Sequence, residues 1–387
     1  MTTTTNKEQK KLNVPNLRFP EFQGEWEELG LSELLDFKNG LNPKLDKFGK
    51  GIKFISVMDI LNNAVITYDC IKASVDVTEK ELSDFSVEKG DILFQRSSET
   101  LEDVGRANVY MDDKTAVFGG FVIRGKKKGE YDPQYFNYLL RSPFARKRIV
   151  PMGAGAQHFN IGQEGLSKVK LHFANIKEQK KIGKMFSLLD ERIATQNKII
   201  EKLQSLIKGL RVRLIQIESG NIVHLGEIAQ IYQPQTISST ELTEDGFLVY
   251  GANGIIGKYK EYNHKTEQIC ITCRGNTCGM VNYTKPMSWI TGNAMVINTD
   301  EHPNKVCKRY LYHYLSAYNF NSIISGSGQP QIVRTPLEKL EITLPSIFEQ
   351  EQKVMLLDRI QAKIEISNRV LSLYQGQKQY LLRQMFI

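Results

Sequence analysis

The feature that most constrains this chain is a long internal repeat: about fifty residues at its end copy a stretch from its middle at a fixed offset. A repeat of this length predicts two similar halves, and such halves usually meet a partner that is itself two-fold. The motif Leu-Leu-Asp at 188–190 and 356–358 fits an offset of 168 better, which leaves the register near the start of the second copy open. The identical residues 171 positions apart are Leu166/Leu337, Lys168/Lys339, Ile176/Ile347, Glu178/Glu349, Gln179/Gln350, Ile193/Ile364, Asn197/Asn368, Gln204/Gln375 and Leu210/Leu381.

Both copies carry apolar residues in alternating steps of four and three, over about five heptads and without an interrupting proline. Such a pattern predicts a coiled coil or a long pair of helices. Gln196 and Ser367 place a polar residue at the same register of each run, and a polar seam residue can fix pairing at some cost in stability. The first run is Ile182, Phe186, Leu189, Ile193, Gln196, Ile200, Leu203, Ile207, Leu210 and Leu214. The second is Leu357, Ile360, Ile364, Ser367, Leu371, Tyr374, Lys378, Leu381 and Met385.

The length of these helices indicates a spacer. A continuous helix from Glu178 to Ile215 would span roughly 57 Å at 1.5 Å per residue. One interpretation is that each helix packs only on its own domain. We favour a rod that separates two domains, because packing helices are rarely this long.

A globular segment precedes each helix, and short β-branched and aromatic runs broken by Gly and Asn predict strands and turns in both. The two segments resemble each other in Asp91–Arg96 and 268–274, and again in the helical motifs 135–140 and 310–315. The sequence therefore predicts an α+β protein of alternating globular domains and helices. We expect a disordered tail at 1–15, domains at 16–174 and 219–345, and long helices at 175–218 and 346–387.

Composition adds weaker constraints. A formal net charge of +8 favours a polyanionic partner, although many soluble proteins carry such an excess. The sequence contains neither a stretch of roughly 20 apolar residues nor an apolar segment behind a basic N-terminal cluster, so we expect no membrane span and no signal peptide. Five cysteines, an odd number, indicate free thiols and a cytoplasmic location.

Each globular segment ends in a loop of small residues, Gly153–Phe159 and Ser325–Gln331. Glycines let the backbone turn sharply or approach a surface closely. A glutamine follows the small residues in both copies, Gln157 and Gln329, and glutamine can read adenine in the major groove. A plain turn is the alternative for either loop alone, but the recurrence favours function.

With these features together, the chain resembles the specificity subunits of type I restriction-modification systems, from about Pro15 to Phe386. The motifs that carry the resemblance are Leu17-Arg-Phe-Pro-Glu-Phe, Trp26, Gly-Ala-Gly-Ala-Gln-His-Phe-Asn-Ile at 153–161, Ser-Gly-Ser-Gly-Gln-Pro-Gln-Ile at 325–332, Leu-Pro-Ser-Ile at 344–347, the Glu-Gln that opens each helix and the terminal Tyr-Leu-Leu-Arg-Gln-Met-Phe. The first copy reads Phe173-Ala-Asn-Ile where the second has Leu344-Pro-Ser-Ile, so it lacks the proline usual at this boundary.

The resemblance implies two target-recognition domains that each read one half of a bipartite, asymmetric double-stranded DNA target. It implies that the two long helices pair antiparallel as spacers, in a pseudo-two-fold arrangement. It further implies two methyltransferase subunits, which modify adenine, and motor/endonuclease subunits as partners. The specificity subunit itself would be non-catalytic and need no cofactor.

A search of the sequence for catalytic motifs supports that expectation. There is no Asn-Pro-Pro-Tyr-type motif, and the segment 251–259 resembles a phosphate loop but has Tyr259 where Ser or Thr would hold magnesium. Cys270 and Cys273, with Cys278 and Cys307, suggest zinc only weakly, because residues three apart in a strand point to opposite faces. We expect no metal.

The candidate DNA contacts are polar and basic residues at or beside loops after predicted strands. In the first half they are Arg96, Ser97, Arg106, Gln157 and His158. In the second half they are Arg274, Asn276, Thr277, Asn293, Gln329, Gln331 and Arg334. The alternative function is a coiled-coil scaffold whose globular domains bind proteins, which would lack the steep salt dependence of DNA binding.

Overall fold

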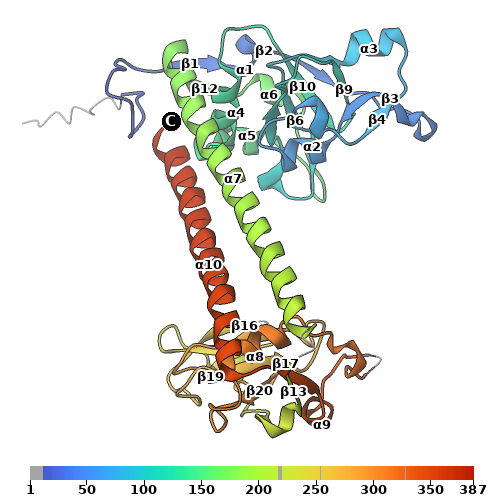
Figure 1. Ribbon diagram of the computed structural model, residues 1–387. Helices are drawn as coiled ribbons and strands as arrows, with labels where there is room; N and C mark the ends of the chain where they lie inside the picture. Colours follow the sequence, from blue (N-terminus) through green and yellow to red (C-terminus); the bar gives the residue numbers. More distant parts are fainter. Residues whose placement is uncertain (1–11, 217–219, 253, 327) are drawn as a thin grey trace, which may run out of the picture. The chain divides into compact units, whose positions relative to one another are not determined.

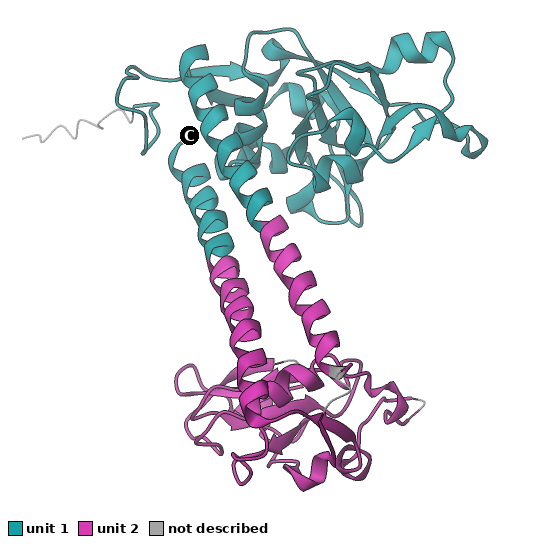
Figure 2. Ribbon diagram, in the orientation of Figure 1, with its two compact units in different colours: residues 1–196, 370–387 teal, residues 197–369 magenta. Residues whose placement is uncertain are grey.

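The computed structural model describes residues 12–216, 220–252, 254–326 and 328–387. Globular α+β segments alternate with two long helices, α7 (Ile176–Ile215) and α10 (Ile347–Gln384), as drawn in Figure 1. The chain divides into two compact units (Figure 2). Unit 1 comprises residues 1–196 and 370–387, and unit 2 comprises 197–369, so each long helix contributes to both. Of the predicted tail, residues 1–11 lie outside the described ranges.

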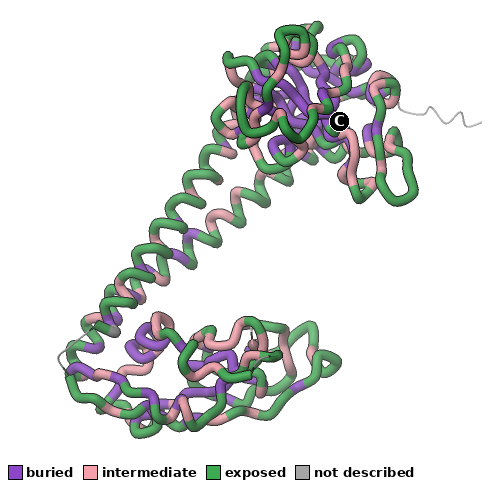
Figure 3. Tube along the Cα trace, turned by 90° about the vertical axis from the view of Figure 1, so that its right-hand side faces the viewer, coloured by how far each residue is buried: buried purple, intermediate pink, exposed green. Residues whose placement is uncertain are grey.

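The two heptad runs are confirmed as the buried stripes of α7 and α10. Every seam position from Ile182 to Leu214 and from Leu357 to Met385 is buried or half-buried. Buried positions recur along both helices in Figure 3, whereas much of their remaining surface is exposed. Within the described ranges, no helix is both long and apolar enough to cross a membrane.

Within each unit the two helices run antiparallel, as the resemblance implied. In unit 1 the ring of Phe186 stacks on Phe386 at 5.8 Å, and Lys378 forms an ion pair with Asp190. In unit 2, Ile207 and Leu214 of α7 share a buried apolar cluster with Val354, Leu357 and Ile364 of α10. The contacts of unit 1 move forward along α7, from Phe186 to Asp190, and backward along α10, from Phe386 to Lys378, as expected for an antiparallel pair.

A polar side chain caps the start of each long helix. The carbonyl and side-chain oxygens of Asn175 accept hydrogen bonds from the N–H groups of Gln179 and Glu178, at 2.9 and 3.0 Å. At the second start, Ser346 Oγ accepts from the N–H of Glu349 at 3.4 Å, and the Glu349 carboxylate accepts from the N–H of Ser346 at 3.0 Å. A side-chain cap is enough to start a helix, so the first copy needs no preceding proline.

The glutamine that follows each cap ties the helix to the globular segment. Gln179 accepts from the N–H of Asp132 at 2.9 Å and donates to the carbonyl of Ala174 at 2.7 Å. Gln350 accepts from the N–H of Cys307 at 2.8 Å and donates to the carbonyl of Pro345 at 2.9 Å. Asp132 and Cys307 precede the equivalent helices α4 (Pro133–Arg141) and α8 (Lys308–Leu315). The Glu-Gln motif is therefore a structural anchor in both halves.

The N-terminal and C-terminal motifs of the chain meet in unit 1. The N–H of Leu17 donates to the carbonyl of Gln384 at 2.9 Å, and Arg18 donates from Nε and Nη2 to the buried Glu178 carboxylate at 2.8 Å each. Trp26 lies edge-on against Phe386 at 6.3 Å between ring centroids. These contacts explain why the two ends carry recognisable motifs.

Unit 1 is built on a four-stranded antiparallel sheet in the order β2-β10-β6-β8. Its strands are β2 (Leu35–Asn39), β10 (Val122–Lys127), β6 (Ile92–Gln95) and β8 (Ala107–Val109). A second sheet, in the order β4-β3-β9-β5, comprises β4 (Ser74–Val75), β3 (Phe48–Ile55), β9 (Ala116–Phe118) and β5 (Ser86–Val87). A two-stranded sheet pairs β1 (Glu27–Gly30) with β12 (Lys170–Phe173). The short helices are α1 (Leu31–Leu34), α2 (Val57–Asn62), α3 (Glu79–Phe85), α5 (Pro143–Ile149) and α6 (Gln163–Ser167).

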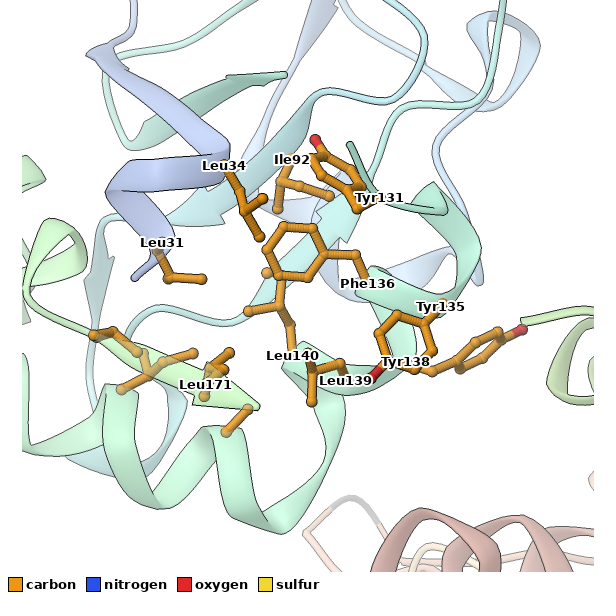
Figure 4. Close-up of a cluster of buried hydrophobic side chains, with 14 of the residues drawn as sticks. Leu31, Leu34, Ile92, Tyr131, Tyr135, Phe136, Tyr138, Leu139, Leu140 and Leu171 are labelled. Carbon is orange, nitrogen blue, oxygen red and sulfur yellow. The ribbon is translucent and has the colours of Figure 1, made fainter. Parts of the chain in front are cut away.

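The core of unit 1 forms where α4 packs on the four-stranded sheet β2-β10-β6-β8. Tyr135, Phe136 and Leu139 of α4 are fully buried and meet Ile92 of β6 and Leu171 of β12 in one cluster (Figure 4). Burial of these side chains supplies the main stabilisation of the unit, at roughly 1.5–3 kcal/mol per large apolar side chain.

Unit 2 repeats this plan. Its antiparallel sheet has the order β14-β20-β17-β18, and a two-stranded sheet pairs β13 (Asn221–His224) with β21 (Glu341–Leu344). The strands of the larger sheet are β14 (Gln230–Tyr232), β20 (Ala294–Asn298), β17 (Ile269–Thr272) and β18 (Val281–Tyr283). A three-stranded sheet contains β16 (Gly254–Tyr259), β15 (Phe247–Gly251) and β19 (Trp289–Ile290), and the short helix α9 spans Arg334–Glu338. The predicted α+β architecture with an internal repeat is therefore confirmed.

Candidate nucleic-acid interface

In unit 1, the loop of small residues closes on itself. Ala154 and Asn160 exchange two backbone hydrogen bonds of 2.9 Å each. Gly155 has a φ of +145°, and a Cβ at this position would lie 2.0 Å from the carbonyl oxygen of His158, so the closed loop requires glycine. The tip of the loop presents Gln157 and His158, both exposed, to solvent.

The closed loop is attached to the segment that follows β6. Strand β11 (Phe159–Asn160) pairs with β7 (Ser97–Ser98), and the side chains of Ser97 and Asn160 are hydrogen-bonded. The N–H of Arg96 donates to the carbonyl of Phe121, and its own carbonyl accepts from the N–H of Ile161, at 2.9 Å each. The structure therefore brings five residues onto one surface, which we call face 1: Arg96, Ser97, Gln157, His158 and Asn160.

Arg106 lies apart from face 1, in a separate cationic cavity of about 780 Å³. Its guanidinium pairs with Asp103 at 2.6 Å, and Arg141 and Arg146 line the same cavity. Arg146 donates to the carbonyls of Glu102 and Val104 at 2.8 and 2.6 Å. Burial, reinforced by the charge of Arg106, lowers the pKa of Arg146 to about 10, so its guanidinium stays charged at neutral pH. Lys147 also lines the cavity, and these four basic residues outnumber the acidic Glu102 and Asp103, so the lining carries a net positive charge.

In unit 2, the corresponding loop closes in the same way. Ser325 and Gln331 exchange two backbone hydrogen bonds, of 2.9 and 2.8 Å. Gly326 has a φ of +94°, and a Cβ there would lie 2.4 Å from the carbonyl oxygen of Gln329. The N–H of Ile332 donates to the carbonyl of Cys273 at 3.0 Å, which fastens the loop beside the end of β17.

A cavity of about 350 Å³ gathers three candidate residues of unit 2: Arg274, Gln331 and Arg334. Arg334 Nε donates to Glu338 Oε1 at 2.6 Å, whereas Arg274 is exposed. The turn that carries Asn293 lies next to them, because its carbonyl accepts from the N–H of Cys273 at 3.2 Å. We call Arg274, Asn293, Gln329, Gln331 and Arg334 face 2.

Asn276 and Thr277 occupy the turn just beyond face 2. The N–H of Cys278 donates to the carbonyl of Gly275, and that of Met280 to the carbonyl of Thr277, both at 3.0 Å. The side chain of Asn276 is exposed and that of Thr277 is half-buried. The two residues therefore flank face 2, and neither lines the cavity that gathers Arg274, Gln331 and Arg334.

The matching backbone hydrogen bonds align the two faces position by position. The bridge Ala154–Asn160 corresponds to Ser325–Gln331, with the offset of 171 seen in the sequence. The equivalent pairs are therefore Ser97/Arg274, Phe121/Asn293, His158/Gln329 and Asn160/Gln331. Pairing Gln157 with Gln329 by residue type is wrong, because the backbone places Gly328 opposite Gln157.

Among the residues that the structure describes, no group of three or more His, Cys, Asp or Glu side chains could hold a metal ion. Cys270 is buried in β17, and burial raises the pKa of its thiol to about 12, which makes it a poor ligand or nucleophile. The two faces offer amides, hydroxyls and guanidinium groups, which suit hydrogen bonding to base edges and phosphates.

Comparison with known proteins identifies the family of the chain. A family model described as "Type I restriction modification DNA specificity domain" matches residues 23–205 and 218–373. The chain belongs to this family. Membership confirms the predicted role in DNA sequence recognition and assigns the chain the non-catalytic part of such a system.

Individual proteins similar to this chain are also specificity subunits of type I restriction systems by name. A Methanocaldococcus jannaschii protein provisionally named as the specificity subunit of type I restriction enzyme MjaX is 25% identical, over 93% of this chain and 92% of the relative. The EcoprrI specificity subunit of Escherichia coli is 32% identical over 35% of this chain and 34% of its own length. The crystal structure of a type I restriction-modification S subunit from M. genitalium shares the fold, with a TM-score of 0.67 and 18% identity over 97% of this chain and 99% of that one.

Sequence reasoning missed Asn160 of face 1 and Phe121, which lies at the border of that face. Asn160 stands 171 positions before Gln331, so the offset of the repeat was sufficient to find it. Phe121 is equivalent to Asn293 but differs from it in chemistry, and no rule based on residue type links a phenylalanine to an asparagine.

Proposed function

We propose that this specificity protein reads a bipartite, asymmetric DNA target, with face 1 on one half-site and face 2 on the other. The observation that carries the proposal is the correspondence of the two faces: the same backbone frame holds Ser97, His158 and Asn160 in one unit, and other side chains in the second. Equal frames with unequal side chains suit two half-sites of different sequence.

The candidate contacts follow from this frame. Asn160 and Gln331 each carry an amide that can bond adenine through two hydrogen bonds, and Arg274 can bond guanine in the same bidentate manner. Arg96, Ser97, Gln157, His158, Asn276, Thr277, Asn293, Gln329 and Arg334 complete the proposed base and phosphate contacts. Arg106 is assigned to a phosphate, because its cationic cavity lies outside face 1.

The long helices set the distance between the half-sites in this proposal. A helix rises 1.5 Å per residue, so the 40 residues of α7 and the 38 of α10 can act as fixed spacers. We assign the target-recognition domains to 16–174 and 219–345, and the spacers to 175–218 and 346–387. The spacing between half-sites then becomes part of the recognised sequence.

The partners in this proposal are two methyltransferase subunits, which modify adenine within the target, and motor/endonuclease subunits, which cleave. Adenine must leave the base stack to be methylated, a step that belongs to the methyltransferase. Five free cysteines and a DNA substrate are in keeping with a cytoplasmic complex.

Genome-wide mapping of methylated adenine tests the proposal. The chain is expressed with its methyltransferase partner in a host without DNA methylation. A split motif modified in both halves, and absent when this chain is omitted, is the expected result. An assembled complex that creates no new motif would instead support the alternative, a coiled-coil scaffold that binds proteins.

A further inference from the structure

Face 1 is bordered by an exposed aromatic side chain that the proposed contacts do not use. Phe121 is 68% exposed and occupies the turn between β9 and β10. Its carbonyl accepts from the N–H of Arg96 at 2.9 Å, and Arg96 Nη1 donates to the adjacent carbonyl of Gly120 at 3.3 Å. The turn that carries the ring is thus held beside face 1.

An apolar cavity of about 360 Å³ opens next to this ring. Phe48, Phe54 and Met58 line it together with Phe121, and none of its lining residues is charged. Gly120 forms part of the wall, and a Cβ there would lie 1.9 Å from Asn42 Oδ1, so a larger residue would require the Asn42 side chain to move. A surface of this kind suits an apolar group and disfavours a phosphate.

The major groove of DNA contains one apolar group, the 5-methyl of thymine, and phenylalanine is among the side chains that contact it. The equivalent position of face 2 carries Asn293, whose amide can instead bond adenine. The two positions therefore share a backbone frame and differ in which base they suit.

We propose that Phe121 and the adjoining apolar cavity form a contact for a thymine 5-methyl group in the half-site read by unit 1. Phe121 and Asn293 are then a matched pair of specificity-determining positions. This inference rests on the proposed function, because it requires face 1 to lie against DNA.

Binding of modified duplexes by the assembled methyltransferase complex tests the inference. Each thymine in the unit 1 half-site is replaced in turn by uracil, which lacks only the methyl group. One methyl contact corresponds to about a fourfold change in affinity. At one position we expect uracil to weaken wild-type binding about fourfold, and we expect Phe121→Ala to bind the thymine and uracil duplexes equally.

Two variants serve as controls. Phe144→Ala removes an exposed phenylalanine of α5 outside face 1 and should retain the uracil effect. Asn293→Ala should alter recognition of the other half-site and leave the uracil effect intact.

Three results would overturn the inference: tolerance of uracil at every position, an undiminished uracil effect in Phe121→Ala, or a unit 1 half-site without thymine on either strand. If Phe121→Ala instead lowered the affinity for the thymine duplex and for the uracil duplex by the same factor, the uracil effect would persist. That result would indicate that Phe121 acts as a wedge between bases or contacts a protein. If the proposed function itself were wrong, the wild-type complex would show no sequence-specific binding in the first place.

Discussion

Arg211 of α7 donates a hydrogen bond from Nε to Nδ1 of His313 in α8, at 3.1 Å. On the other side of the ring, His313 Nε2 lies 2.9 Å from Asp358 Oδ1. A ring nitrogen that accepts a hydrogen bond carries no proton, so this geometry fixes the neutral form with the proton on Nε2. Burial lowers the pKa of His313 to about 4, and the charges of Arg211 and Arg309 act in the same direction against the opposing effect of Asp358.

Stability of unit 2 should therefore depend on pH through His313. Its pKa falls from the ordinary 6.5 to about 4 on folding, so between these pH values the unfolded chain binds a proton that the folded chain excludes. Stability is unaffected above pH 6.5 and declines as the pH falls towards 4, by up to about 3 kcal/mol. Thermal unfolding of wild type and His313→Gln across this range measures the difference.

His302→Gln is the control for that experiment, because His302 lies in the same unit outside this network. We expect it to keep the wild-type slope, whereas His313→Gln should flatten it. Equal slopes for wild type and His313→Gln would show that His313 is not the titrating group.

The buried glutamines at the starts of the long helices, Gln179 and Gln350, should stabilise the short helices next to them. Gln350→Ala would leave the part-buried N–H of Cys307 and the carbonyl of Pro345 without their partner, at a cost of about 2 kcal/mol. Amide hydrogen exchange should then accelerate in α8, while Gln179→Ala should do the same in α4. The exposed Gln352→Ala should change neither, and acceleration spread evenly over the chain would contradict a local anchor.

The long helices were predictable from the sequence because burial of one stripe of each helix produces apolar residues in alternating steps of three and four. The contacts between the long helices and the short helices α4 and α8 were not predictable, although the residues that make them lie in the repeat. Asp190 accepts from Tyr138 of α4, and Asp358 from Arg309 and His313 of α8. The shared role of the two aspartates explains why their motif follows an offset of 168, because it depends on reaching equivalent short helices rather than on helix register.

The candidate site was predictable by region and less so by residue. The sequence identified the loops that follow strands as candidate regions, because glycine and polar residues are concentrated there. Which side chains share a face depends on hydrogen bonds such as those between Ala154 and Asn160, and residue type does not reveal them. Arg106 shows the same limit: its backbone lies beside Gln95, next to Arg96, but its side chain lines a cavity that contains no residue of face 1.

Asn160 and Gln331 should each govern one half-site only. Asn160→Ala should relax the base preference at a single position of the unit 1 half-site, and Gln331→Ala at a single position of the other. The loss of a bidentate contact costs roughly 1–3 kcal/mol, which methylation mapping would register as a degenerate base. Gln329→Ala should likewise relax the unit 2 half-site alone, and changes in both halves from one substitution would contradict the assignment.

Arg274 and Arg334 should differ in their contribution to the salt dependence of DNA binding. Arg274 is exposed, so Arg274→Gln should reduce the slope of log affinity against log salt by about one if it contacts a phosphate. Arg334 already pairs with Glu338 at 2.6 Å, and Arg334→Gln should reduce the slope less. If Arg274 bonds guanine instead, its substitution should alter the motif, and an unchanged slope with an unchanged motif would remove Arg274 from the interface.

Lengthening both long helices should lengthen the gap between half-sites. Seven residues placed after Asn197 and seven after its repeat counterpart Asn368 preserve the heptad register and add about 10 Å of helix. Because one turn of DNA rises about 34 Å, the mapped spacer should grow by about one to three base pairs while both half-sites keep their sequences. The same seven residues placed at the exposed Glu244 should leave the spacer unchanged. A spacer of constant length in the variant with both helices extended would show that the helices do not measure the DNA.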